Sequence, residues 1–146
     1  MKLVMTLLVR DEEDILRENI EFHLAQGVDF IIATDNLSQD STPEILEHYR
    51  RHGVLQVIQE TRDDYSQHTW VTRMARMAAV DFGADWVINN DADEFWQPNG
   101  QADVKSCLAR FPATVRAAAA ARHNFPIVSV DEPSDLPFFE RLTWRD

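Results

Sequence analysis

Apolar runs of strand length alternate with helix-like segments along most of the chain, and each run ends in polar residues. The apolar runs cover residues 3–9, 30–33, 54–58 and 86–88. Between them, apolar side chains recur every three or four positions, as on one helix face, within residues 12–26, 42–53 and 66–82. Strands that alternate with helices across short joints form a parallel sheet with right-handed connections. We therefore expect an α/β fold with a mainly parallel open sheet and helices on both faces.

Composition and length indicate one globular domain. The 146 residues are 45% apolar and 27% charged, and no internal repeat or Gly/Pro/Ser linker divides them, so we expect a single domain over residues 1–146. No apolar run reaches the roughly 18 residues that span a bilayer. Met1 leads directly into the first apolar run without a signal cleavage site, and we expect a cytoplasmic protein with no transmembrane segment.

The charge and the missing motifs exclude several function classes. A net charge of -11 argues against a nucleic-acid partner. The single cysteine, Cys107, excludes an intrachain disulfide and a cysteine zinc cluster. Neither G-x-G-x-x-G nor G-x-x-x-x-G-K-[ST] occurs, which disfavours a dinucleotide-dependent dehydrogenase and a P-loop NTPase. A phosphate ligand of so acidic a chain would therefore need a bridging cation.

Polar residues at the carboxyl ends of the expected strands are candidates for such a site. Ligands of open parallel sheets bind beyond these ends, where residues 10–12, 35–36, 62–64 and 91–94 would converge. Asp91 and Asp93 are two positions apart, so on a continuing strand they project to one side and can hold one hard cation. The alternative is an acidic turn after a strand, which a D-x-D pattern taken alone favours.

Three segments together resemble a known enzyme family. They read L-L-V-R-D-E at residues 7–12, D-N-L-S-Q-D-S-T at residues 35–42, and G-A-D-W-V-I-N-N-D-A-D-E-F-W at residues 83–96. In order and spacing they resemble the motifs of family 2-like glycosyltransferases with the GT-A fold. The resemblance covers residues 3–98 well and the remainder weakly. It implies transfer of a sugar from a nucleoside diphosphate sugar to a hydroxyl of a saccharide or lipid-linked acceptor. The first candidate for the donor is a UDP-sugar, and the reaction is expected to invert the configuration at the sugar carbon.

The resemblance also implies roles for individual residues. Asp35 would hold the base or ribose, and Asp93 would bind Mn²⁺ or Mg²⁺ directly, with Asp91 shared between the metal and the ribose. A divalent ion stabilises the negative charge that develops on a leaving diphosphate. The full set of expected nucleotide-sugar-binding residues is Val9, Arg10, Glu12, Asp35, Asn36, Arg73 and Asp91. Arg73 stands apart in this set: it could neutralise the diphosphate or merely solvate a helix face. The chain departs from the usual pattern at Leu37, where glycine is common.

The later part of the chain carries no recognisable catalytic base. Its acids, Asp131, Glu132, Glu140 and Asp146, stand in no motif for a base, so the catalytic residues stay unassigned. We expect the donor-binding part of a transferase, truncated or unusually small. A non-catalytic nucleotide or cation-binding module is the main alternative. A nucleotidyltransferase would need a basic loop after the first strand, where this chain has Arg10 followed by four acids.

Local patterns give four further expectations. His23 is expected to be a partly buried helix residue rather than a ligand. Residues 103–111 are expected to form a short helix, and residues 115–122 a strand. Exposed apolar side chains near the C-terminus predict either a homodimer surface or the place where a missing half would pack: Phe138, Phe139, Leu142 and Trp144.

Overall fold

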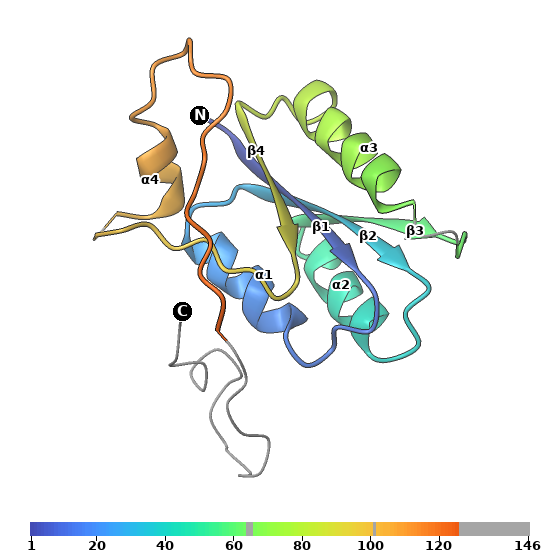
Figure 1. Ribbon diagram of the computed structural model, residues 1–146. Coiled ribbons are helices and arrows are strands. Elements are labelled where there is room, and N and C mark those ends of the chain that lie inside the picture. The colour runs from blue at the N-terminus through green and yellow to red at the C-terminus, as the bar shows by residue number, and fades with distance from the viewer. Residues whose placement is uncertain (64–65, 101, 126–146) are drawn as a thin grey trace. The chain divides into compact units, whose positions relative to one another are not determined.

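The computed structural model describes residues 1–63, 66–100 and 102–125, and its contacts divide the chain into two units, residues 1–111 and residues from 112 onward. All described helices and strands lie in the first unit (Figure 1). In chain order they are β1 (Leu3–Val9), α1 (Leu16–Ala25), β2 (Phe30–Asn36), α2 (Thr42–Arg51), β3 (Leu55–Glu60), α3 (Gln67–Val80), β4 (Trp86–Asp91) and α4 (Val104–Leu108).

The four strands form one sheet in the order β3-β2-β1-β4, and every neighbouring pair is parallel. The chain steps from β1 to β2 to β3 in one direction and then returns to the other side of β1. Right-handed connections therefore place α1 and α2 on one face and α3 on the opposite face, as Figure 1 shows. The expected α/β fold is confirmed, and the strand order reverses between β1 and β4.

The face of the sheet under α3 carries an apolar core. Val4 of β1 and Ile32 of β2 pack with Met74 and Ala78 of α3, and all four are fully buried. Trp70 at the start of the same helix is also buried. Because side chains alternate along a strand, the intervening residues of β1 and β2 face α1 and α2. The sheet is thus covered on both sides and provides a rigid base for the loops at its carboxyl edge.

Two expected elements differ in the structure. Helix α1 begins at Leu16 rather than at Glu12: the Glu12 carbonyl accepts the amides of Ile15 and Leu16 in a turn, but Ile15 has a φ angle of -129°, so the regular helix starts only after it. The strand expected at residues 115–122 is absent: this stretch has no regular structure. Its alanine-rich sequence carries no alternating apolar face that a sheet could bury.

The short helix α4 lies within the range of the helix expected at residues 103–111 but ends at Leu108. Asp103 precedes the helix and its carboxylate accepts the amide of Ser106 at 2.6 Å, which is a helix N-cap. Within the described ranges, no helix is both long and apolar enough to cross a membrane. The four apolar side chains near the C-terminus lie outside the described residues.

Candidate functional site at the carboxyl edge of the sheet

The ends of three neighbouring strands lie side by side at the carboxyl edge. Val9 of β1 is in register with Asp35 of β2, while Leu8 of β1 is in register with Asp91 of β4. The strand order reverses between the paired strands β1 and β4. Open α/β sheets bind ligands beyond the carboxyl ends of the strands at this kind of reversal. The structure therefore brings three of the residues expected from the sequence to neighbouring places at the carboxyl edge: Val9, Asp35 and Asp91.

The loops that follow β1 and β2, residues 10–14 and 37–42, are joined by hydrogen bonds, and we call them the paired loops. The amide of Asp11 donates to Ser38 Oγ at 3.0 Å, and Asp11 Oδ1 accepts the amide of Gln39 at 2.6 Å. Each loop therefore uses its side chains to satisfy backbone groups of the other. Such reciprocal bonds fix the loop conformation without a bound ligand.

Asp40 is the central acid of the paired loops. Its two carboxylate oxygens accept the amides of Thr42 and Glu13, both at 2.9 Å, and in return Glu13 accepts the amide of Ser41 at 2.9 Å. Thr42 Oγ1 accepts the amide of Glu12 at 2.9 Å. Desolvation is the largest single influence on Asp40 and raises its pKa, but the hydrogen bonds from Thr42 and Glu13 together outweigh it and hold this pKa below its usual value. Asp40 also serves the first turn of α2, where Ser41 makes no side-chain cap.

Two residues of the paired loops have left-handed backbone conformations. The φ angle is 56° at Asp11 and 61° at Leu37. A leucine is strained in this region because its Cβ approaches the following carbonyl oxygen, whereas glycine is not. The departure from glycine at Leu37, noted in the sequence, therefore falls on a position where the backbone favours glycine.

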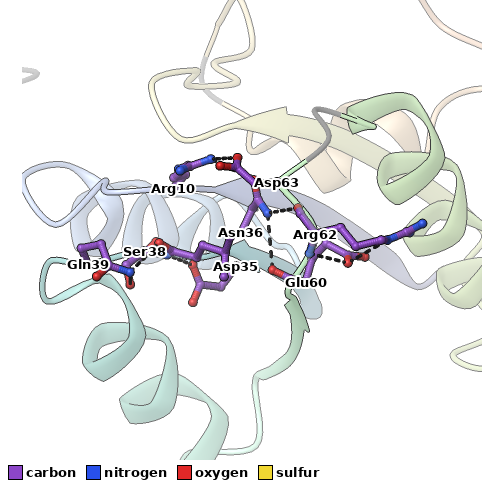
Figure 2. Close-up of polar contacts among 9 residues, drawn as sticks. Arg10, Asp35, Asn36, Ser38, Gln39, Glu60, Arg62 and Asp63 are labelled. Carbon is purple, nitrogen blue, oxygen red and sulfur yellow. Dashed lines mark hydrogen bonds and ion pairs between the residues drawn. The ribbon is translucent and has the colours of Figure 1, made fainter.

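Asp35 and Asn36 end β2 in nearly complete burial, with 2% and 5% of their surfaces exposed. Asp35 Oδ1 accepts the amide of Ser38 at 3.2 Å. Asn36 Nδ2 donates to the carbonyl oxygen of Arg62 at 2.9 Å, and its Oδ1 accepts from Arg10 Nη1 at 3.5 Å (Figure 2). Asn36 thus ties the end of β2 to the residues that follow β3.

Arg10 and Arg73 form ion pairs in this structure. Arg10 Nη1 lies 2.7 Å from Asp63 Oδ1, so its guanidinium is held over the end of the sheet (Figure 2). Arg73 Nη2 lies 3.5 Å from Glu60 Oε2 at the end of β3. A hydrogen bond from Arg62, opposed by desolvation, holds the pKa of Glu60 below its usual value. In this structure Arg73 is therefore paired with an acid at the end of β3.

The acids after β4 are arranged differently. Asp91 and Asp93 are exposed, and neither carboxylate accepts a hydrogen bond or joins an ion pair with any residue of the described ranges. Glu12 is partly buried; burial, followed by the charges of Asp14, Asp93, Asp40 and Asp91, raises its pKa. The loop after β1 therefore places a third carboxylate within electrostatic reach of the D-x-D pair.

The ligand chemistry of Asp91 and Asp93 can be compared with that of Mg²⁺ and Mn²⁺ sites. In the described part of the chain, no group of three or more His, Cys, Asp or Glu side chains is arranged to hold a metal by itself. Mg²⁺ is normally held by one or two carboxylates and completes its octahedron with water and substrate phosphates. Carboxylates and water also suit Mn²⁺. Asp91 and Asp93 therefore fit an ion that arrives with a phosphate ligand and do not form a closed cage.

The structure also identifies residues that sequence reasoning did not assign to the site. Asn19 of α1 donates to carbonyl oxygens of the loop after β4, and His23 accepts a backbone amide from the same loop. The available signal was a pair of polar residues at positions i and i+4 on a helix face that also carries Leu16 and Ile20. A buried polar side chain on such a face needs a hydrogen-bond partner.

Comparisons with known proteins agree with this geometry. The sequence model of glycosyltransferase family 92 matches residues 5–135. No curated protein matches the chain significantly. The crystal structure of S. aureus TarS 1-349 is similar in fold, with a TM-score of 0.55 and 20% identity over 65% of this chain and 28% of that chain.

Two further TarS structures give the same result. S. aureus TarS 1-349 in complex with UDP has a TM-score of 0.54 and 19% identity over 75% of this chain and 31% of that one. The crystal structure of S. aureus TarS has the same TM-score and identity, over 75% of this chain and 19% of that one. This chain spans less than a third of each of those chains, and the likeness is one of fold.

Proposed function

The chain belongs to glycosyltransferase family 92, and we propose that the carboxyl edge of its sheet binds a nucleoside diphosphate sugar as the donor for sugar transfer. A UDP-sugar is the first candidate, because the TarS structure that shares the fold is a complex with UDP. A hydroxyl of a saccharide or lipid-linked molecule is the proposed acceptor. The matched family is family 92, and the resemblance to family 2-like GT-A enzymes, like inversion, stays a prediction.

One observation carries this proposal. At the point where the strand order reverses, Asp91 and Asp93 are exposed and have no hydrogen bond or ion pair within the described residues, while their neighbour Glu12 adds negative charge. Like charges repel, and no hydrogen bond within the described residues offsets this repulsion between Asp91 and Asp93. A bound ligand of opposite charge would offset it. A divalent cation, bound with a diphosphate, is such a ligand.

The residues at the ends of β1 and β2 would bind the nucleoside, and the acids after β4 would bind the metal ion. Asp35 uses Oδ1 to hold Ser38, and Oδ2 accepts no hydrogen bond from the residues described, so it is the proposed acceptor for a nucleoside N–H or O–H group. Val9, Arg10 and Glu12 would close over the nucleoside. Asn36 would keep the end of β2 in place.

The proposed metal ion, Mn²⁺ or Mg²⁺, would be held by Asp91 and Asp93 and would stabilise the charge of the leaving diphosphate. The two carboxylates would keep this ion at the carboxyl edge of the sheet, where it offsets their repulsion of the diphosphate. No residue is assigned as the base that deprotonates the acceptor, since Asp131, Glu132, Glu140 and Asp146 all lie outside the described residues. Arg73 pairs with Glu60 in this structure, and its expected contact with the diphosphate stays a prediction.

Calorimetry with UDP tests the proposal. Native chain is expected to bind UDP at least about tenfold more tightly with Mn²⁺ than without it, and Asp93→Asn should remove this gain. Asp81→Asn is the matched control, because Asp81 is an exposed acid at the C-terminus of α3, away from the strand ends. Absence of UDP binding would overturn the donor site, and binding that ignores Mn²⁺ would overturn the role of Asp91 and Asp93.

Turnover separates an enzyme from a binding module. Native chain is incubated with UDP-sugars, Mn²⁺ and candidate hydroxyl acceptors, and released UDP is measured. Release that depends on acceptor and is lost in Asp93→Asn supports transfer by this chain. Metal-dependent UDP binding without release under any acceptor would identify a donor-binding module that needs another part of a protein for catalysis.

A further inference from the structure

The backbone that follows β4, residues 91–96, is attached to α1 by buried side chains, and we call this segment the acidic loop. Asn19 is fully buried, and its Nδ2 donates to the carbonyl oxygens of Ala92 and Glu94, both at 2.8 Å. These two carbonyl groups lie on either side of Asp93. One amide group of α1 therefore fixes the backbone both before and after the proposed metal ligand.

His23, one helical turn after Asn19, holds the end of the acidic loop. Its Nε2 accepts the amide of Trp96 at 3.2 Å, and its Nδ1 lies 2.8 Å from the carbonyl oxygen of Asn19. Because Nε2 accepts a hydrogen bond from the Trp96 amide, we assign the neutral tautomer with its hydrogen on Nδ1, which donates to the Asn19 carbonyl. The ring also stacks on Phe95, with centroids 6.0 Å apart and planes at 19°.

Asn90, 5% exposed at the end of β4, completes the attachment from the strand side. Its Nδ2 donates to the carbonyl oxygens of Asp91 at 2.8 Å and Glu94 at 3.1 Å. The amide of Glu94 donates to the carbonyl of Asp91 at 3.0 Å and closes a tight turn. These bonds hold the backbone of the turn to α1 and β4, while the carboxylates of Asp91 and Asp93 remain exposed.

We propose that Asn19 and His23 are positioning residues, which hold the acidic loop so that Asp91 and Asp93 present their carboxylates to one cation. The inference rests on the proposed function, because it concerns how that site is arranged. Two carboxylates bind one ion well only if their separation is set in advance; a mobile loop would let them move apart to reduce their repulsion. Side chains that orient metal ligands typically change metal affinity about 10- to 100-fold when removed.

The test compares substitutions on a single helix. His23→Leu removes the acceptor for Trp96, whereas His23→Gln can restore it with its amide oxygen. Ile20→Val trims a fully buried apolar side chain of the same helix, which forms no hydrogen bond, and serves as the matched stability control. For each variant we would measure UDP affinity with and without Mn²⁺, and amide exchange across residues 92–96.

The expected result separates positioning from general stability. His23→Leu should lower the Mn²⁺-dependent gain in UDP affinity at least about tenfold, with little change in the affinity measured without metal, and speed exchange of the Trp96 amide. His23→Gln should recover most of both, and Ile20→Val should leave both unchanged. Asn19→Leu should act in the same direction as His23→Leu. If Asn19→Leu does not fold, the two His23 variants decide the matter.

The outcomes distinguish this inference from the proposed function. If native chain shows the Mn²⁺ effect and His23→Leu retains all of it, the positioning role is wrong while the donor site stands. If native chain shows no Mn²⁺ effect, the cation site is wrong, and with it the claim that Asn19 and His23 position metal ligands. Faster exchange of Trp96 in His23→Leu would then show attachment of the loop alone.

Discussion

The paired loops and the acidic loop are both rich in acids, yet they use them in opposite ways. In the paired loops, the carboxylates of Asp11, Glu13 and Asp40 each accept at least one backbone amide. In the acidic loop, the backbone is held by side chains from α1 and β4, and Asp91 and Asp93 have no such bond within the described residues. The first set of acids shapes the fold, and the second is left available to a ligand.

This difference shows which acids are informative about function. A carboxylate that accepts backbone amides has a structural reason to be present, and its substitution should cost stability. A carboxylate that lies beside like charges and stabilises nothing should cost no stability when it is removed. The comparison therefore yields opposite expectations for residues that look equivalent in the sequence.

The largest expected effect comes from replacing one acid of each class by alanine and comparing the stability of the two variants. Asp40→Ala leaves the amides of Glu13 and Thr42 without their acceptor and should lower the free energy of unfolding by about 2 kcal/mol. Asp93→Ala should change it by no more than about 0.5 kcal/mol. Urea unfolding of both variants measures the difference. An equal loss in both variants would mean that the acidic loop also depends on its carboxylates for structure.

The fold was largely predictable from the sequence, because it depends on period and order. Four apolar runs with helical segments between them require a parallel sheet, and the strand ends must then meet at one edge. The ends of elements were less predictable. Acids in residues 12–14 suit the first turn of a helix, and the Glu12 carbonyl does accept the Leu16 amide, but the backbone of Ile15 departs from helical geometry and α1 starts at Leu16.

The site was predictable only in part, for a related reason. The D-x-D pair could be found from its pattern, but the strand expected to carry both acids ends at Asp91, and Asp93 lies in the turn that the Glu94 amide closes onto the Asp91 carbonyl. The attachments of the acidic loop could not be found, since Asn19 and Ala92 are 73 residues apart and only the folded chain brings them together. The sequence likewise did not single out Asp40 as the residue that accepts the Thr42 amide at the start of α2, because Ser41 and Thr42 are equally plausible helix caps by residue type.

A second difference between the two regions should appear as pH falls. Burial lowers the pKa of His23, although its hydrogen bond to Asn19 acts in the opposite direction. A histidine with a lowered folded pKa contributes its stability above the unfolded value, about 6.5, and loses it as pH falls through the folded pKa. The pKa of Asp40 is also lowered, so its bonds persist down to about pH 4.

The acidic loop should therefore loosen at a higher pH than the paired loops. Amide exchange, corrected for the intrinsic pH dependence, would be followed for Trp96, which donates to His23, and for Thr42, which donates to Asp40. Protection of Trp96 is expected to fall first, below about pH 6.5. His23→Gln should abolish this early step. Simultaneous loss at both amides would contradict separate attachment of the two regions.

The strain in the paired loops predicts a smaller effect. Leu37→Gly relieves a left-handed leucine, worth about 1–2 kcal/mol, but adds freedom to the unfolded chain and removes some buried surface. The net gain in the free energy of unfolding should be about 0.5 kcal/mol, measured in urea. Gly53→Ala is the converse control: φ is 74° at Gly53, so placing a Cβ there should lower the free energy of unfolding. A loss of stability in Leu37→Gly would mean that the leucine side chain contributes more by packing than the backbone loses by strain.

The smallest effect separates two adjacent acids of one loop. Glu12 lies near the charges of Asp91 and Asp93, whereas Glu13 accepts the amide of Ser41. Glu12→Gln removes repulsion and should raise the free energy of unfolding by about 0.3 kcal/mol, while Glu13→Gln weakens a charged hydrogen bond and should lower it by a similar amount. Mn²⁺ with UDP should reduce the gain from Glu12→Gln, because a bound cation already offsets the repulsion. Two shifts of the same sign, or a gain that Mn²⁺ and UDP leave unchanged, would show that Glu12 belongs with the structural acids of the paired loops.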